Sequence, residues 1–76
     1  MTQGIKEKDI RDFEKYANKL VDVMRRIKQY KPEANAYLAE DSLNLMSDVH
    51  HDWNAKSCQE NIVTTVYMPF FDGGDW

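Results

Sequence analysis

The residues best suited to chemistry lie in one stretch, SDVHHDWN, which places Asp48, His50, His51 and Asp52 within five positions. Imidazole and carboxylate groups are ligands for Zn²⁺ and Mn²⁺. Neighbouring side chains of an extended chain point in opposite directions, so His50 and His51 cannot easily share one ion. The sequence has no second cluster to complete a coordination shell. His50, His51 and Asp52 remain candidate ligands, but we expect a solvated polar loop without a bound metal.

Catalysis would require further groups around this loop. A general acid-base pair of His51 and Asp52 needs a nucleophile and a pocket, and nothing in the pattern marks Ser47 or Ser57 as the nucleophile. Cys58 is the single cysteine, so the chain has no internal disulfide and no thiolate pair for a redox or metal site. We therefore expect a protein that is not an enzyme and that uses no cofactor.

Charge divides unevenly along the chain. Residues 1–31 hold nine bases and five acids, whereas residues 32–76 hold one base and eight acids. The net charge of −3 thus hides a basic first part of +4 and an acidic second part of −7. Such asymmetry suggests steering toward a charged partner, or head-to-tail self-association.

The basic part contains a patch that could contact the phosphates of nucleic acid. The patch consists of Lys19, Arg25, Arg26 and Lys28. The same pattern is typical of any solvated helix face, and the acidic second part of the chain would repel a polyanion. Nucleic-acid binding is therefore the alternative interpretation and not the first.

The stretch MPFFDGGDW, residues 68–76, combines aromatic rings with carboxylates. Tryptophan is a frequent hot-spot residue, and an aromatic anchor beside acids suits an apolar pocket rimmed by Arg or Lys. Trp76 could instead dock on its own helix, on a second copy, or on nothing, because Gly73 and Gly74 should make this tail pliant. The candidate partner-binding residues are Glu40, Asp41, Phe70, Phe71, Asp72, Asp75 and Trp76.

Two periodic segments must position these residues. Apolar residues spaced alternately by three and four, from Ile10 to Ile27, predict an amphipathic helix over about 6–30, which Pro32 ends. Residues 61–68, NIVTTVYM, alternate in the manner of a strand, and a strand needs a neighbour.

The segment 35–47 can be interpreted in two ways. Its Ala, Leu, Glu and Met residues favour a helix, whereas its alternation around Glu40-Asp41 favours a hairpin. We predict the hairpin because it supplies the missing partner of the strand at 61–68.

The predicted fold is α+β: one long N-terminal amphipathic helix packed on a small antiparallel sheet, made of the hairpin and the third strand. Residues 1–76 form a single domain, with a loop at 48–60 and an acidic aromatic tail at 69–76. The helix should bury one sheet face, made of Leu38, Leu43, Leu45, Ile62 and Val66. Because so small a core gains from a shared interface, we also expect a homo-oligomer.

The second half of the chain resembles small accessory proteins of tailed phages and prophages. The resemblance is carried by AYLAEDSLNLM, by the HHD loop and by MPFFDGGDW. Those proteins end in a similar Gly-Gly-Asp-Trp and carry a Ser-His-Asp-Asp segment where this chain has VHHDWN. The resemblance implies a mobile-element origin and a protein that binds and inhibits a host enzyme or defence complex. It transfers no catalytic residue.

The cellular location is predicted from the absence of membrane-span and signal-peptide patterns in the sequence. No apolar run reaches the roughly 18 residues of a membrane span, and the start, MTQGIKEKDIRD, lacks the apolar stretch of a signal peptide. We therefore expect a soluble cytoplasmic protein without a membrane partner; if it is phage-encoded, the cytoplasm is that of the host cell.

Overall fold

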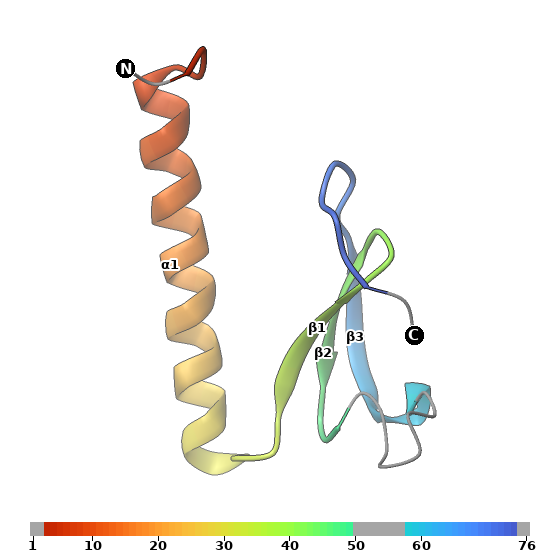
Figure 1. Ribbon diagram of the computed structural model, residues 1–76. Coiled ribbons are helices and arrows are strands. Elements are labelled where there is room, and N and C mark those ends of the chain that lie inside the picture. Colours follow the sequence, from red (N-terminus) through yellow and green to blue (C-terminus); the bar gives the residue numbers. More distant parts are fainter. Residues whose placement is uncertain (1–2, 50–57, 75–76) are drawn as a thin grey trace.

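The computed structural model describes residues 3–49 and 58–74, and it places one long helix beside a small sheet (Figure 1). The elements are α1 (Glu7–Tyr30), β1 (Asn35–Ala39), β2 (Ser42–Met46), the 3-10 helix η1 (Gln59–Asn61) and β3 (Ile62–Tyr67). The strands form an antiparallel sheet in the order β1-β2-β3. The predicted α+β fold is confirmed, and a hairpin, not a second helix, follows Pro32.

α1 begins and ends where its charges and the proline place it. Glu7 and Asp9 lie in the first turn and Lys28 in the last, the arrangement that complements the helix dipole. The N–H of Lys31 donates to the carbonyl of Ile27 at 2.8 Å and closes the last turn. Pro32 has no N–H to continue the helix, so the chain leaves for β1 within four residues.

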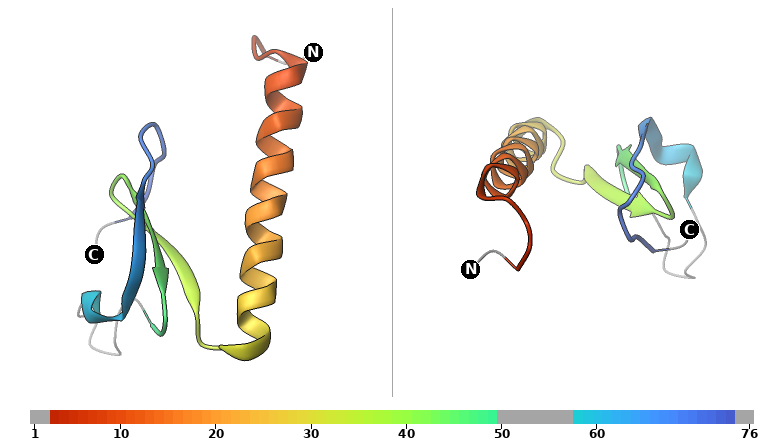
Figure 2. Two further views of the ribbon diagram at one scale, coloured as in Figure 1. Left: turned by 180° about the vertical axis from the view of Figure 1, so that it is seen from behind. Right: turned by 90° about the horizontal axis from the view of Figure 1, so that it is seen from above.

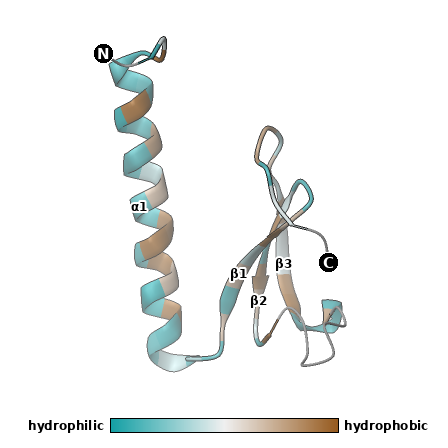
Figure 3. Ribbon diagram, in the orientation of Figure 1, coloured by the Kyte–Doolittle hydropathy of each residue, from teal (hydrophilic) through white to brown (hydrophobic). Residues whose placement is uncertain are grey.

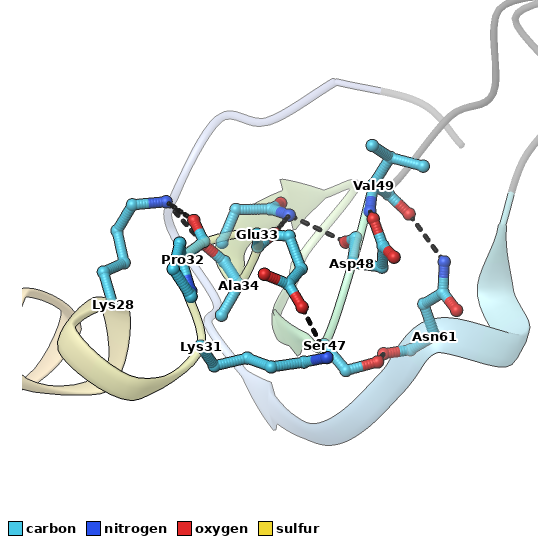
Figure 4. Close-up of polar contacts among 10 residues, drawn as sticks. Lys28, Lys31, Pro32, Glu33, Ala34, Ser47, Asp48, Val49 and Asn61 are labelled. Carbon is cyan, nitrogen blue, oxygen red and sulfur yellow. Dashed lines mark hydrogen bonds and ion pairs between the residues drawn. The ribbon is translucent and has the colours of Figure 1, made fainter.

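A lysine fixes this connection between α1 and β1. The ammonium of Lys28 donates to the carbonyls of Pro32 and Ala34, both at 2.8 Å (Figure 4). Next to it, Lys31 and Glu33 form an ion pair of 2.6 Å. The hydrogen bond and the negative charge of Glu33 raise the pKa of Lys31, and the hydrogen bond from Lys31 lowers the pKa of Glu33. The angle at which α1 leaves the sheet is thus held by polar contacts.

The two faces of the sheet differ in what covers them. Strand side chains alternate, and the register aligns Leu38, Leu43 and Val66 across one face, toward α1. The opposite face carries Asn44 and Met46. The buried residues of the described chain are Ala34, Ala39, Asn44, Met46 and Cys58. The packed core therefore lies on the face turned away from α1.

The predicted burial of the other face is wrong. None of Leu38, Leu43, Leu45, Ile62 and Val66 is buried. Val66 remains 54% exposed, and α1 contributes no buried residue at all. The physical reason is the position of α1, which stands off from the sheet instead of lying flat on it (Figure 2).

Asn44 is the one buried polar residue among those described, with 2% of its surface exposed. Its side-chain amide donates to the carbonyls of Tyr37 at 3.2 Å and Ser42 at 3.1 Å. Its side-chain oxygen accepts a hydrogen bond from the Thr65 hydroxyl at 2.7 Å. One side chain of the central strand thus joins both neighbouring strands.

We expect Asn44→Ala to lower the free energy of unfolding by about 2 kcal/mol, because it removes buried hydrogen bonds. The matched control is Thr65→Ser, which keeps the hydroxyl that donates to the buried Asn44 oxygen and should cost less than about 1 kcal/mol. Urea denaturation of both variants measures the difference. Equal losses in the two variants would contradict the central role of Asn44.

Candidate partner-binding surface

The C-terminal tail returns to the sheet and pairs with it. After β3 the chain turns at Pro69 and Phe70 and crosses toward β1 (Figure 1). The N–H of Gly74 donates to the carbonyl of Leu38 at 3.0 Å, and the N–H of Glu40 donates to the carbonyl of Gly74 at 2.6 Å. The tail thus forms a short parallel bridge at the outer edge of β1.

This pairing brings two distant segments together at the hairpin end of the sheet. The N–H of Met68 also donates to the carbonyl of Asp41, at 2.7 Å, so both ends of the crossing segment are bonded to the β1–β2 turn and its flanks. We call the result the acidic–aromatic surface. It consists of Glu40, Asp41, Phe70, Phe71 and Asp72, all exposed. Asp75 and Trp76, which the sequence also predicts as partner-binding residues, lie outside the described residues.

The acidic–aromatic surface carries unneutralised negative charge. Between residues 32 and 74, the described part of the chain contains six acids and no Lys or Arg. Among described residues, none of Glu40, Asp41 and Asp72 forms an ion pair. The field at this end of the molecule is therefore negative and suits a basic partner.

Phe70 is fully exposed and has a backbone φ of 72°. This left-handed conformation costs a residue with a side chain on the order of 1 kcal/mol. An exposed ring gains no packing in return. The strained turn thus presents the Phe70 ring to solvent.

Phe71 points the other way, toward α1. Together with Phe13, Tyr16, Leu20 and Met68 it lines an apolar hollow of about 220 Å³ between α1 and the tail. Phe71 therefore belongs both to the acidic–aromatic surface and to the boundary with α1.

The predicted basic patch lies on α1, and most of its members have partners within the chain. Arg25 pairs with Asp22 at 3.0 Å, and Lys28 holds the connection to β1. The Lys19 ammonium lies 5.7 Å from the centre of the Tyr16 ring. A phosphate would have to compete with these contacts.

The predicted metal ligands His50, His51 and Asp52 lie outside the described residues. Within residues 3–49 and 58–74, no group of three or more His, Cys, Asp or Glu side chains could hold a metal ion. In the same residues, no helix has the length and apolarity needed to cross a membrane.

Comparisons of the chain with known protein families, curated proteins and solved structures find no match. The fold and its surfaces are therefore the observations that bear on function.

The role of the glycine pair was not predicted from the sequence. Gly73 and Gly74 were expected to loosen the tail, yet the tail bonds to β1 through Gly74. The Gly73-Gly74 pair could have indicated this pairing with β1, because glycine is also the residue that lets two backbones approach closely. A Cβ on Gly73 would lie 2.6 Å from the Leu38 carbonyl oxygen and 2.7 Å from Leu38 Cγ.

We expect Gly73→Ala to displace the tail from β1, because backbone and side chain both block the added Cβ. The amides of Glu40 and Gly74 should then exchange hydrogen faster. Gly74→Ala is the matched control, since its Cβ would meet only the Tyr37 hydroxyl, at 3.1 Å. Hydrogen exchange followed by NMR measures both variants, and unchanged protection of Glu40 in Gly73→Ala would contradict the close packing.

Proposed function

We propose that the protein is a non-enzymatic interaction protein, which binds a host protein complex through its acidic–aromatic surface and inhibits or modulates it. One observation carries the proposal. The hydrogen bonds from Gly74 and Met68 to the hairpin hold five candidate residues in one place before any partner arrives. A surface that is already ordered loses less conformational entropy on binding.

The composition of the surface indicates the chemistry of the partner. Phe70 offers an exposed aromatic anchor, and the tail and the turn bonded to it carry the exposed acids Glu40, Asp41 and Asp72. Anchors of this kind fill apolar pockets, while complementary charge speeds encounter and rejects wrong partners. A pocket rimmed by Arg or Lys on a nucleic-acid-processing or defence complex matches both features.

Two further observations from the sequence support a host complex as the target. The second half of the chain resembles phage accessory proteins, many of which bind host enzymes. The predicted partner-binding residues Asp75 and Trp76 directly follow Gly74 in the sequence.

The strained backbone of Phe70 provides a test in which stability and affinity change in opposite directions. We expect Phe70→Gly to raise the free energy of unfolding by up to about 1 kcal/mol, since glycine adopts φ 72° without strain. The same change should weaken binding by about 2 kcal/mol, because the anchor is lost. Phe70→Ala is the control, which loses the ring but keeps the strained Cβ, so it should lose affinity without gaining stability.

The partner is obtained by affinity capture from a host lysate, followed by nuclease treatment. An interaction protein retains a stoichiometric protein after nuclease, and the double variant Asp41→Asn with Asp72→Asn should capture it more slowly at low salt. A protein that binds nucleic acid through the basic patch would lose its cargo on nuclease treatment and show a steep salt dependence. Capture that is the same for wild type and Phe70→Gly would overturn the proposal.

A further inference from the structure

The apolar face of α1 is uncovered in a single chain. No residue of α1 is buried, and Phe13 and Tyr16 remain 67% and 60% exposed. Apolar positions recur along the whole helix (Figure 3). Exposed apolar faces of this size are unusual in monomeric proteins and mark interaction sites.

The dimensions of the whole chain lead to the same conclusion. A compact chain of 76 residues has a radius of gyration of about 11 Å, whereas this one has 14.7 Å. Its accessible surface is 6194 Å², about 1,300 Å² more than the roughly 4,900 Å² expected for a compact monomer of 9.0 kDa. A stable interface buries about 800 Å² on each partner, so the excess is enough for one.

The sheet is too short to cover α1. A helix of 24 residues is about 36 Å long, whereas strands of five or six residues span about 17–20 Å. Accordingly, the apolar groove between α1 and the sheet, of about 170 Å³, is lined on α1 only by residues between Leu20 and Ile27. At the other end, Ile5, Ile10 and Phe13 line a hollow with no sheet residue. Met68 and Phe71 of the tail reach only the hollow beside Phe13 and Tyr16, and both of these rings stay exposed. The N-terminal half of the apolar face is therefore left for a neighbour other than the sheet.

We propose that this neighbour is α1 of a second copy, packed antiparallel about a two-fold axis near the middle of the helix. This arrangement places the uncovered N-terminal half of each helix on the C-terminal half of the other, whose Leu20, Met24 and Ile27 line the open groove beside the sheet and are not buried. In one register Ile10 meets Ile27 of the second copy, Phe13 meets Met24, and Ala17 meets Leu20. Each contact occurs twice, as a two-fold interface requires.

Charge selects the antiparallel direction. Residues 7–18 hold four acids and three bases, whereas residues 19–31 hold one acid and five bases. Parallel helices would place the two basic halves together. Antiparallel helices place each basic half against an acidic end and also align the helix dipoles favourably.

The charged residues on the two sides of the apolar face also favour the antiparallel arrangement. A helix turns by about 100° per residue, so Asp12 and Arg26 lie on one flank and Glu14 and Arg25 on the other. In an antiparallel pair about a two-fold axis, each flank faces the same flank of the second copy. Asp12 therefore faces Arg26 of the second copy, and Glu14 faces Arg25, in nearly the same register as the apolar contacts.

This proposal does not rest on the proposed function, although the two surfaces meet at Phe71. The first test is the oligomeric state of the full chain by sedimentation equilibrium. We expect a dimer for the wild type and, for Phe13→Asp, a dimer affinity that is lower by at least about tenfold, with an unchanged circular dichroism spectrum. Tyr67→Ser is the matched control, because Tyr67 is also 67% exposed but lies on β3, and it should dimerise normally.

The second test exchanges the charges on one flank. Asp12→Arg and Arg26→Asp should each weaken the dimer, because each places like charges opposite one another, and the two changes together should restore it. A parallel pair would place Asp12 opposite Asp12, so the single changes would have no such effect. A wild type that stays monomeric, a dimer insensitive to Phe13→Asp, or a double variant no tighter than the single ones would each overturn the proposal.

Discussion

The hydrogen bonds of Asn44 hold the sheet together, and the rest of the molecule is arranged around that sheet. Asn44 lies in the central strand β2, bonds to the backbone of β1 and receives the hydroxyl of Thr65 from β3. A buried amide is costly unless its groups are paired, so this side chain favours one register of the three strands over any slipped alternative. That register turns the Leu38 carbonyl and the Glu40 N–H outward, where the tail bonds to them. The acidic–aromatic surface therefore depends on Asn44, although Asn44 takes no part in it.

α1 is attached to this sheet in a different way. Its link is a short connection clamped by Lys28, and no large apolar contact holds it. A chain of this size has enough apolar residues for a helix face and a sheet face but buries mainly the far side of the sheet. The uncovered helix face and the acidic–aromatic surface meet at Phe71, so the two surfaces are neighbours.

Much of the fold could be predicted from the sequence because it depends on local patterns. The spacing from Ile10 to Ile27 predicted the helix, and the unpaired strand at the other end predicted the hairpin, against the helix propensity of Ala, Leu and Glu. The buried face could not be predicted. Leu43 and Leu45 indicated that the core lies toward the helix, whereas the buried Met46 and Asn44 point the other way. From the sequence alone, Asn44 would be predicted to be an exposed polar residue. Its hydrogen-bond partners Tyr37 and Thr65 are known only once the register of the three strands is known.

The sequence indicated which residue types could form the candidate surface, but not how those residues are arranged in space. Aromatic and acidic residues near the C-terminus suggested recognition, but the turn at Glu40-Asp41 joins them only because the tail crosses the sheet and bonds to β1. Long-range pairing of this kind leaves no periodic signal in the sequence. The glycine pair was its one local sign, and it is equally typical of a flexible segment.

The crossing tail also affects how the protein behaves at high concentration. Edge strands expose backbone donors and acceptors that can recruit strands from other molecules and begin aggregation. By bonding to Leu38 and Glu40, Gly74 occupies part of the β1 edge with the chain's own backbone. The opposite edge, β3, keeps exposed Val63 and Tyr67. The tail thus covers part of the β1 edge, and we expect strand addition between molecules to occur more readily at β3 than at β1.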